Sequence, residues 1–235
     1  MKLGGVSICG SYHKINQDRF FVREIEGGAF LVVSDGLGSR KSSQAGSAAL
    51  CQAVSETVEN FSVENFDNEK FLSSIHSSWL KILLDSNLKI EDCNATALIG
   101  LKKFNELRLF RLGDGFITAA FDDSAISLFD AKEDGFANIT DCLTADFDFE
   151  LWECRRVEFK NFVGMIAGTD GVTFEIEEEN LNKFVAEFCN SYADDELVEI
   201  LADIKSWLPK LSGVDDKTLA FVIEGENFEG NNFLH

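Results

Sequence analysis

The sequence predicts an α+β fold in which antiparallel sheets are covered by pairs of helices. Segments whose apolar residues alternate with period two occur in blocks, and so do segments with helical spacing, whereas a parallel sheet needs strict strand–helix alternation. Hydrophobic residues make up 45% of the 235 residues, and 22 are Phe, which is ample material for a core. We therefore expect one globular domain over 1–235, with a frayed tail from about 226 to 235.

The first part of the chain contains three expected strands followed by two expected helices. Residues 3–9, 19–25 and 29–34 are short apolar runs separated by glycine-containing breaks, which is typical of buried strands. From 42 to about 60 apolar residues recur at every fourth position, and from about 68 to 85 they recur at threes and fours. This spacing predicts two amphipathic helices that each bury one face.

The period returns to two after residue 94, where ATALIGL, ELRLFRL, FITAAF and AISLF indicate a meander of antiparallel strands. Two more strands, two helices and a last strand complete the pattern. Their expected ranges are 152–159 and 162–168 for the strands, 181–192 and 194–206 for the helices, and 218–224 for the last strand.

Charge and cysteine spacing exclude several function classes. Lys and Arg number 21 against 41 Asp and Glu, so the net charge of −20 repels nucleic acid and anionic lipid surfaces. No two of the six cysteines have the CxxC spacing of a structural zinc site. The N-terminal MKLGGVSICG is too short in apolar residues for a signal peptide, and no run approaches a membrane span. We expect a cytoplasmic protein with free cysteines.

Four aspartates lie beside strand-like apolar runs and next to or near glycine: Asp35 in VVSDGLG, Asp114 in FRLGDGF, Asp170 in GTDGV and Asp215 in SGVDDKT. Carboxylates and approachable backbone carbonyls are the oxygen ligands that Mg²⁺ and Mn²⁺ prefer. Asp-Gly is also a frequent turn dipeptide, and the chain contains it at 35–36, 114–115, 134–135 and 170–171. Each of these positions taken alone is compatible with a simple turn.

The order of these motifs resembles the metal-dependent protein serine/threonine phosphatases of the PP2C type, in particular their compact bacterial branch. QDRFFV precedes VVSDGLGS, a small-residue segment CNATALIG precedes RLGDGF, and GTDGV and DDKT follow. The resemblance covers nearly the whole chain and implies a four-layer α-β-β-α sandwich of two antiparallel sheets flanked by helix pairs. It also implies hydrolysis of phosphoserine or phosphothreonine in proteins by a metal-activated water.

The same resemblance implies a role for each matching residue. Asp35 is expected to bridge two Mn²⁺ or Mg²⁺ ions, with the carbonyl of Gly36 holding one of them, and Asp170 and Asp215 are expected to complete the first ion. Asp216, adjacent to Asp215, is expected to orient the turn. Further residues match positions near the second ion's waters, Gln17 and Asp18, or a third ion, Asp114.

Two positions depart from the family pattern. His13 stands where the family often has an arginine for the substrate phosphate, and histidine lacks the bidentate fork of a guanidinium. Leu37 stands where some members have a histidine that can protonate the leaving group. Two alternatives stay open: a pseudophosphatase that binds phosphoproteins and turns over poorly, and a phosphatase whose substrate is a small molecule or a single dedicated regulatory partner.

The partner implied for the enzyme is a phosphorylated protein, the target of a Ser/Thr kinase. The sequence does not indicate an oligomeric state.

Overall fold

Antiparallel strands form two sheets in the computed structural model, which describes residues 1–60, 66–129, 140–173 and 178–225. The first sheet has the strand order β1-β10-β9-β6-β7 and the second β2-β3-β4-β5-β8. The first consists of β1 (Lys2–Ile8), β10 (Lys217–Ile223), β9 (Phe162–Gly168), β6 (Phe116–Phe121) and β7 (Ala125–Phe129). The second consists of β2 (Arg19–Ile25), β3 (Gly28–Ser34), β4 (Ala97–Lys103), β5 (Glu106–Leu112) and β8 (Glu153–Glu158).

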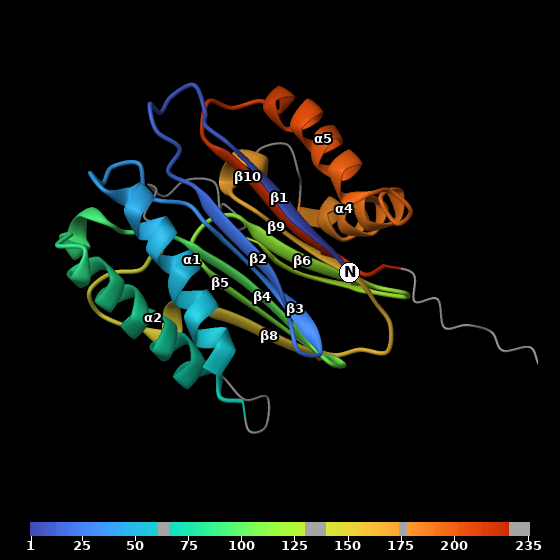
Figure 1. Cartoon of the computed structure of the whole chain (residues 1–235), viewed down its shortest axis with the longest axis horizontal. Coiled ribbons are helices and arrows are strands. Elements are labelled where there is room, and N and C mark those ends of the chain that lie inside the picture. Colours follow the sequence, from blue (N-terminus) through green and yellow to red (C-terminus); the bar gives the residue numbers. More distant parts are fainter. Residues whose placement is uncertain (61–65, 130–139, 174–177, 226–235) are drawn as a thin grey trace, which may run out of the picture.

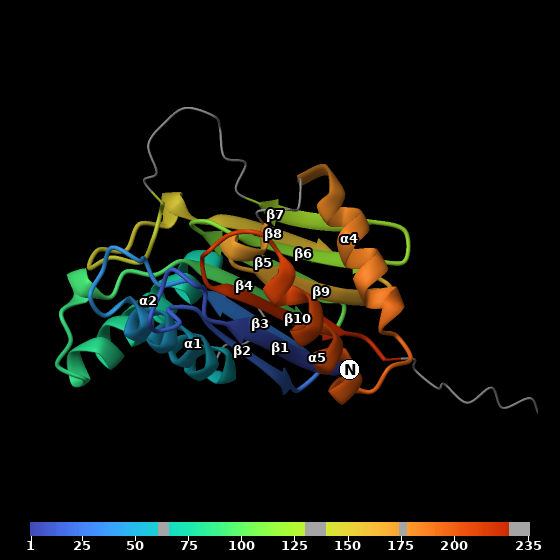
Figure 2. The ribbon, with the colours of Figure 1, turned by 90° about the horizontal axis from the view of Figure 1, so that it is seen from above.

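Helices cover the outer face of each sheet. In Figure 1, α1 and α2 lie against the second sheet, and α4 and α5 lie against the first, so the layers follow the order helix, sheet, sheet, helix. Figure 2, turned by 90°, keeps the two helix pairs on opposite sides of the sheets. The helices are α1 (Ser43–Asn60), α2 (Asn68–Asp85), the one-turn α3 (Asp170–Thr173), α4 (Glu178–Ser191) and α5 (Leu197–Trp207), with 3-10 turns at Ile90–Asp92, Phe149–Leu151 and Leu208–Lys210.

Three apolar clusters hold these layers together. The cluster between the two sheets includes Leu31 and Met165, and the cluster under α1 and α2 includes Trp79. The third lies under α4 and α5 and includes Phe221 and Ile204. Because β3 and β10 have a packed layer on both faces, all seven residues of each are buried. Asp35 follows the last residue of β3, and Asp215 and Asp216 precede the first residue of β10.

The predicted α+β sandwich is confirmed, and most element boundaries differ by three residues or fewer. The predicted meander after residue 94 was wrong in one respect. β4 pairs with β5 in the second sheet, while β6 pairs with β7 in the first, so the chain crosses between sheets at Gly113–Gly115. Both glycines have a positive φ, +86° and +98°, which lets this turn change direction sharply.

Two expectations concern residues outside the described ranges: the frayed tail, 226–235, and the Asp-Gly turn at 134–135. In the described part of the chain, no helix combines the length and the apolar character that crossing a membrane requires.

Candidate metal centre

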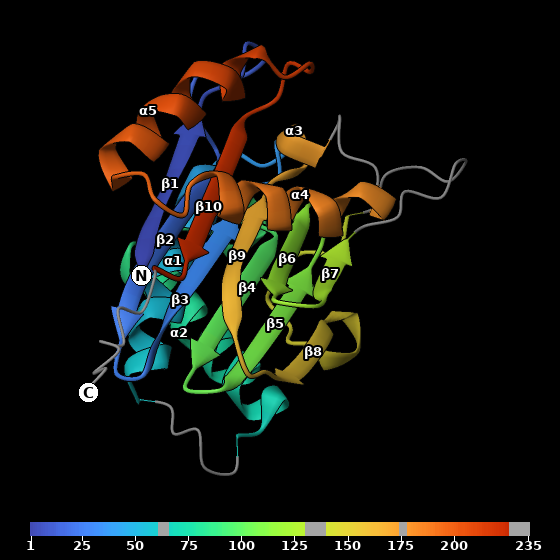
Figure 3. The ribbon, with the colours of Figure 1, turned by 90° about the vertical axis from the view of Figure 1, so that its right-hand side faces the viewer.

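The aspartates singled out from the sequence lie at one end of the sandwich, where strands of both sheets begin or end. Figure 3 shows this end uppermost, with α3 and the loops after β1 and before β10. Asp35 follows β3 and Asp18 precedes β2 in the second sheet, while Asp170 follows β9 and Asp215 lies just before β10 in the first. Chain segments as far apart in the sequence as Asp18 and Asp215 therefore supply carboxylates to the same end of the molecule. We call this end the carboxylate end.

Asp35 lies at the centre of the group. Its backbone is fixed by Thr96, whose hydroxyl accepts from the Asp35 N–H at 3.0 Å and whose N–H donates to the Asp35 carbonyl at 2.8 Å. Burial raises the pKa of Asp35 well above its usual range, and the charges of Asp18, Asp170 and Asp215 raise it further. Asp35 is thus close enough to the three other carboxylates to be repelled by them, and a bound cation would offset this repulsion.

Asp18 supplies an oxygen without a fixed donor. Its side chain is 1% exposed, and its Oδ2 accepts a hydrogen bond from the Thr169 hydroxyl at 2.8 Å. Its Oδ1 is buried and accepts no hydrogen bond from a fixed donor among the described residues. A proton on one of the two carboxyl groups could join Asp18 to Asp35. Burial raises the pKa of Asp18 to about 7, although its hydrogen bonds oppose that shift. The Oε1 atom of Gln17 is likewise buried without a partner in the described part of the chain.

These observations test whether the residues fit a divalent cation. Buried polar atoms are nearly always paired in proteins, so each orphan oxygen requires an explanation. The buried oxygens of Gln17 and Asp18 that lack a partner in the described residues, together with the carboxylates that act on Asp35, match the all-oxygen donor set of Mg²⁺ and Mn²⁺. The donor set therefore fits.

Asp216 binds the backbone of neighbouring loops. It is 2% exposed, its Oδ1 accepts from the N–H of Gly10 at 2.7 Å, and its Oδ2 accepts from the N–H of Gln17 at 2.7 Å. Two carboxylate oxygens are therefore occupied by the loop that follows β1. Asp216 thereby joins that loop to the segment before β10. This agrees with the expectation that Asp216 orients the turn.

His13 lies in the wall of the carboxylate end. Its Nδ1 is 3.3 Å from Asp215 Oδ1 and 3.2 Å from Asp216 Oδ2, and its side chain is 13% exposed. One ligating atom from each of these three residues lies within 4.8 Å of the other two, a spacing that could hold a metal ion. The other ring nitrogen, Nε2, faces the loop after β3, where it lies 3.2 Å from the position that a Cβ on Gly38 would take.

The Gly36–Leu37 segment connects the centre to the neighbouring loops. Gly36 donates its N–H to the carbonyl of Gln17 at 3.2 Å, and Leu37 donates to the carbonyl of Asn94 at 3.0 Å. A Cβ on Gly36 would lie 2.5 Å from the backbone of Ser43, at the start of α1. Only glycine allows α1 to approach Asp35 this closely.

Asp114 lies at the margin of the carboxylate end, in the turn that joins β5 to β6. It is partly buried, and its Oδ2 accepts a hydrogen bond from the Thr140 hydroxyl at 2.8 Å. The adjacent Gly115 packs against the carbonyl of Gly168, two residues before Asp170. This places the turn beside the strand that carries Asp170.

Sequence reasoning missed several residues that build the centre. A Cβ on Gly171 would lie 1.9 Å from the carbonyl oxygen of Asp216, and one on Gly10 would lie 2.2 Å from the carbonyl carbon of Asp215. Thr169 donates its N–H to the carbonyl of Thr218 at 3.1 Å and accepts from the Thr218 N–H at 3.1 Å through its hydroxyl. The sequence identified GTDGV and DDKT as motifs, but it did not indicate the contacts that join them.

Two surface cavities lie away from these aspartates. One of about 550 Å³ is lined by residues that include Phe66, Arg108 and Arg156, and one of about 360 Å³ by residues that include Phe121 and Phe159. Neither includes a residue of the carboxylate end. The chemistry of the aspartates, and not the size of a cavity, identifies the candidate site.

Comparisons with known proteins identify the family and the fold. A family model described as protein phosphatase 2C matches residues 11–208. A bacterial serine phosphatase of known structure superimposes with a TM-score of 0.72 at 14% identity, covering 96% of this chain and 99% of its own. The catalytic domain of the serine/threonine phosphatase PstP, solved with two manganese ions, gives 0.68 at 16% identity, covering 95% and 98%.

Stp1 from Staphylococcus aureus, a serine/threonine phosphatase, gives a TM-score of 0.71 at 12% identity, covering 96% of this chain and 95% of its own. At these identities the structural likeness establishes the fold. No match was found among curated proteins.

Proposed function

We propose, from the premise that this chain belongs to the protein phosphatase 2C family, that it hydrolyses phosphoserine and phosphothreonine in proteins with the help of divalent metal ions. The observation that carries the proposal is the environment of Asp35. Its carboxylate is surrounded by those of Asp18, Asp170 and Asp215, and Asp18 keeps a buried oxygen without a fixed donor in the described residues. Such an arrangement costs stability unless cations bind there.

The residues assigned to the metal ions follow the family pattern. Asp35 would bridge two ions, the carbonyl of Gly36 would hold one of them, and Asp170 and Asp215 would complete the first. Bound Mn²⁺ or Mg²⁺ would lower the pKa of a water molecule and neutralise phosphate oxygens. The two manganese ions of the PstP structure support a count of two. The remaining candidates are Gln17 and Asp18 near the second ion and Asp114 for a third.

His13 is our candidate for the substrate phosphate. Its Nδ1–H donates to the carboxylates of Asp215 and Asp216, which fixes the orientation of the ring. With Nδ1–H engaged, Nε2 offers a second N–H only in the doubly protonated ring. Holding the ring in this orientation leaves Nε2 as the ring atom that would meet a phosphate oxygen.

Activity measurements test the proposal. The chain should hydrolyse p-nitrophenyl phosphate and a phosphothreonine peptide in the presence of Mn²⁺, and Asp35→Asn should abolish both activities. Asp122→Asn is a matched control, because Asp122 bonds to the Asn161 side chain in an exposed turn at the other end of the sandwich. Absence of hydrolysis by the wild-type chain with either substrate would contradict the proposal.

A second candidate function is a phosphoprotein-binding module that turns over poorly. The observation that favours it is that His13 stands in place of the phosphate-binding arginine and Leu37 in place of the proton-donating histidine of some members. Tight phosphopeptide binding at saturating Mn²⁺ without release of phosphate would favour this function over the first.

A further inference from the structure

An exposed apolar surface borders the carboxylate end. Tyr12 is 76% exposed, and Ile15 and Val214 are each 59% exposed. Tyr12 and Val214 belong to different loops, which are joined by a hydrogen bond from the Tyr12 N–H to the Val214 carbonyl at 3.0 Å. Figures 1 and 3 show these loops side by side, one after β1 and one before β10. We call Tyr12, Ile15 and Val214 the apolar rim.

The apolar rim is directly connected to the proposed phosphate site. Tyr12 precedes His13 in the chain, and their rings are in edge contact with centroids 5.1 Å apart. Val214 precedes Asp215, whose carboxylate contacts His13. An extended peptide advances about 3.3–3.6 Å per residue. A phosphorylated residue bound at the carboxylate end would therefore bring its neighbours within one to three positions onto the apolar rim.

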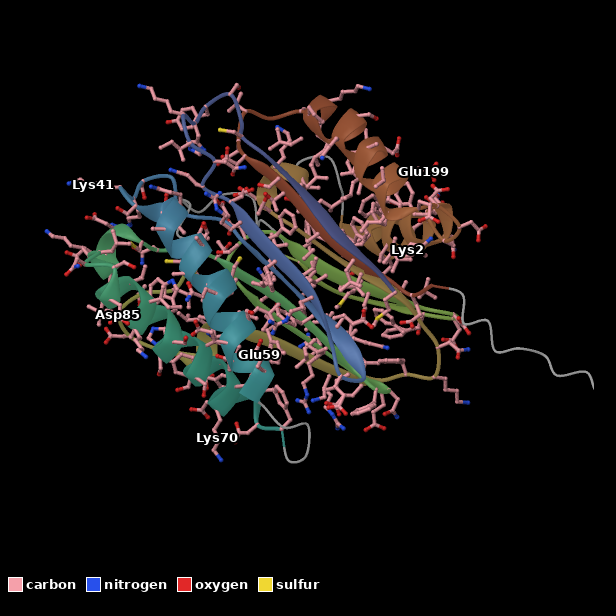
Figure 4. The ribbon with its side chains drawn as sticks, viewed as in Figure 1. Lys2, Lys41, Glu59, Lys70, Asp85 and Glu199 are labelled. Atoms are coloured by element: carbon pink, nitrogen blue, oxygen red, sulfur yellow. The ribbon has the colours of Figure 1, made fainter. Side chains whose placement is uncertain are left out.

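Charge supports a phosphorylated occupant at this place. The whole chain carries −20, so most of its surface repels a phosphate group. Lys14, within the loop of the apolar rim, is exposed, and so are Arg40 and Lys41 on the loop before α1. Figure 4 shows Lys41 on that loop, at the outer margin of the molecule. Exposed cations therefore lie on two of the loops at this end, and one of them, Lys14, lies between Tyr12 and Ile15 in the chain.

We propose that the apolar rim binds the substrate segment, selecting phosphorylated sequences with a large apolar side chain within three residues of the phosphorylated residue. This inference rests on the proposed function, because it names the substrate class of the same site. Tyrosine supplies a large contact area at low conformational cost, which makes Tyr12 the expected main contact. Ile15 and Val214 would cover the rest of the bound side chain.

The test compares two phosphothreonine peptides that differ only in the flanking residues, leucine in one and glycine in the other. For wild type, kcat/KM should be about tenfold higher for the leucine peptide, with the difference in KM. In the double variant Tyr12→Ser/Val214→Ser this preference should disappear. Leu84→Ser is the matched control, since Leu84 is an equally exposed apolar residue, 59%, on α2. It should keep the tenfold preference.

A second readout does not depend on turnover. Fluorescence anisotropy with Mn²⁺ present should show the same preference for the leucine peptide in binding, so it can support the inference even where hydrolysis fails. Hydrolysis of p-nitrophenyl phosphate without any peptide preference in wild type would overturn the inference and leave the proposed function intact. Light scattering that shows a dimer dissociated by Tyr12→Ser/Val214→Ser would also overturn it, since the occupant would then be a second copy of the chain.

Discussion

Asp35 and Asp18 lie among other carboxylates at one end of the sandwich, whereas Glu106 at the other end lies between two arginines. Arg108 donates to Glu106 at 2.6 Å and Arg156 donates at 2.7 Å. Burial alone would raise the pKa of Glu106, but the hydrogen bonds and charges of Arg156 and Arg108 outweigh it and lower the pKa. For Asp35 burial and charge act in the same direction, and the pKa rises.

This difference shows how the fold separates structural from functional acids. Glu106 needs no ion from solution, because its counter-charges are arginines of the same chain. One of them, Arg108, is itself held in place: it donates to Asn68 at 2.7 Å and lies over the ring of Phe66. At the carboxylate end the charges of Asp18, Asp170 and Asp215 act on Asp35 in the same direction as burial, so we expect the stability of this end to depend on bound cations. We expect substitutions at the two ends to act in opposite directions.

The largest expected effect concerns Asp35→Asn and metal-dependent stability. Wild type should gain about 4 kcal/mol in unfolding free energy for each bound ion at a thousandfold excess of Mn²⁺ over its Kd. Asp35→Asn should lose most of this gain, and in EDTA it should be more stable than wild type because one repelling charge is gone. Thermal and guanidinium unfolding with and without Mn²⁺ measure both effects. The account would be contradicted if Asp35→Asn were less stable than wild type in EDTA and gained as much stability from Mn²⁺ as wild type does.

The opposite sign is expected for Glu106→Gln. Removing this carboxylate leaves Arg108, 8% exposed, without its charged partner, which should cost about 3 kcal/mol with or without metal. Glu158→Gln is the control, because Glu158 is 67% exposed and pairs with Arg156 at the surface, where a salt bridge contributes less than about 1 kcal/mol. Equal losses for the two variants in guanidinium unfolding would contradict the account.

Gly171→Ala should weaken both stability and metal binding. The added Cβ would meet the Asp216 carbonyl oxygen at 1.9 Å, so α3 with Asp170 must move away from the segment before β10. We expect a loss of about 2 kcal/mol in unfolding free energy and weaker Mn²⁺ binding by calorimetry. Gly225→Ala is the control, because its nearest neighbour would lie at 3.8 Å. Wild-type Mn²⁺ affinity in Gly171→Ala would show that this close approach does not position Asp170.

The metal-free protein should become less stable as the pH rises from about 4 to about 7. Asp18 has a folded-state pKa of about 7 against its ordinary value of 3.8, so the folded state binds more protons in this window. The contribution of Asp18 to stability is therefore complete below 3.8 and is lost as the pH rises through about 7. One proton corresponds to at most about 1.4 kcal/mol per pH unit. Unfolding in EDTA across this range should show the slope, and Asp18→Asn should reduce it.

Much of the fold could be predicted because it depends on local patterns. The helix at Asn68–Asp85 and the strands at Glu106–Leu112, Phe116–Phe121 and Ala125–Phe129 follow from hydrophobic period and turn residues alone. The assignment of β5 and β6 to different sheets could not be predicted in this way, since period two does not specify a strand's partner. That crossing at Gly113–Gly115 is a property of the assembled layers.

The candidate site was predictable only to the level of motifs. Asp35, Asp170 and Asp215 could be selected from the sequence because each lies beside an apolar strand in a recognised order. The repulsion of Asp35 by the other carboxylates depends on distances between segments far apart in the chain, and so do the orphan oxygen of Asp18 and the contact of His13 with Asp215. The roles of Gly10 and Gly171 also required the structure, because close backbone approach leaves no periodic signal.

The most direct test of the central claim is a crystal structure of the protein soaked with Mn²⁺, with manganese located by anomalous scattering. We predict two peaks at the carboxylate end, both in contact with Asp35 and one also with Asp170 and Asp215. A protein that takes up no manganese there at millimolar Mn²⁺, or that binds it only at the end that carries Glu106, would contradict the account.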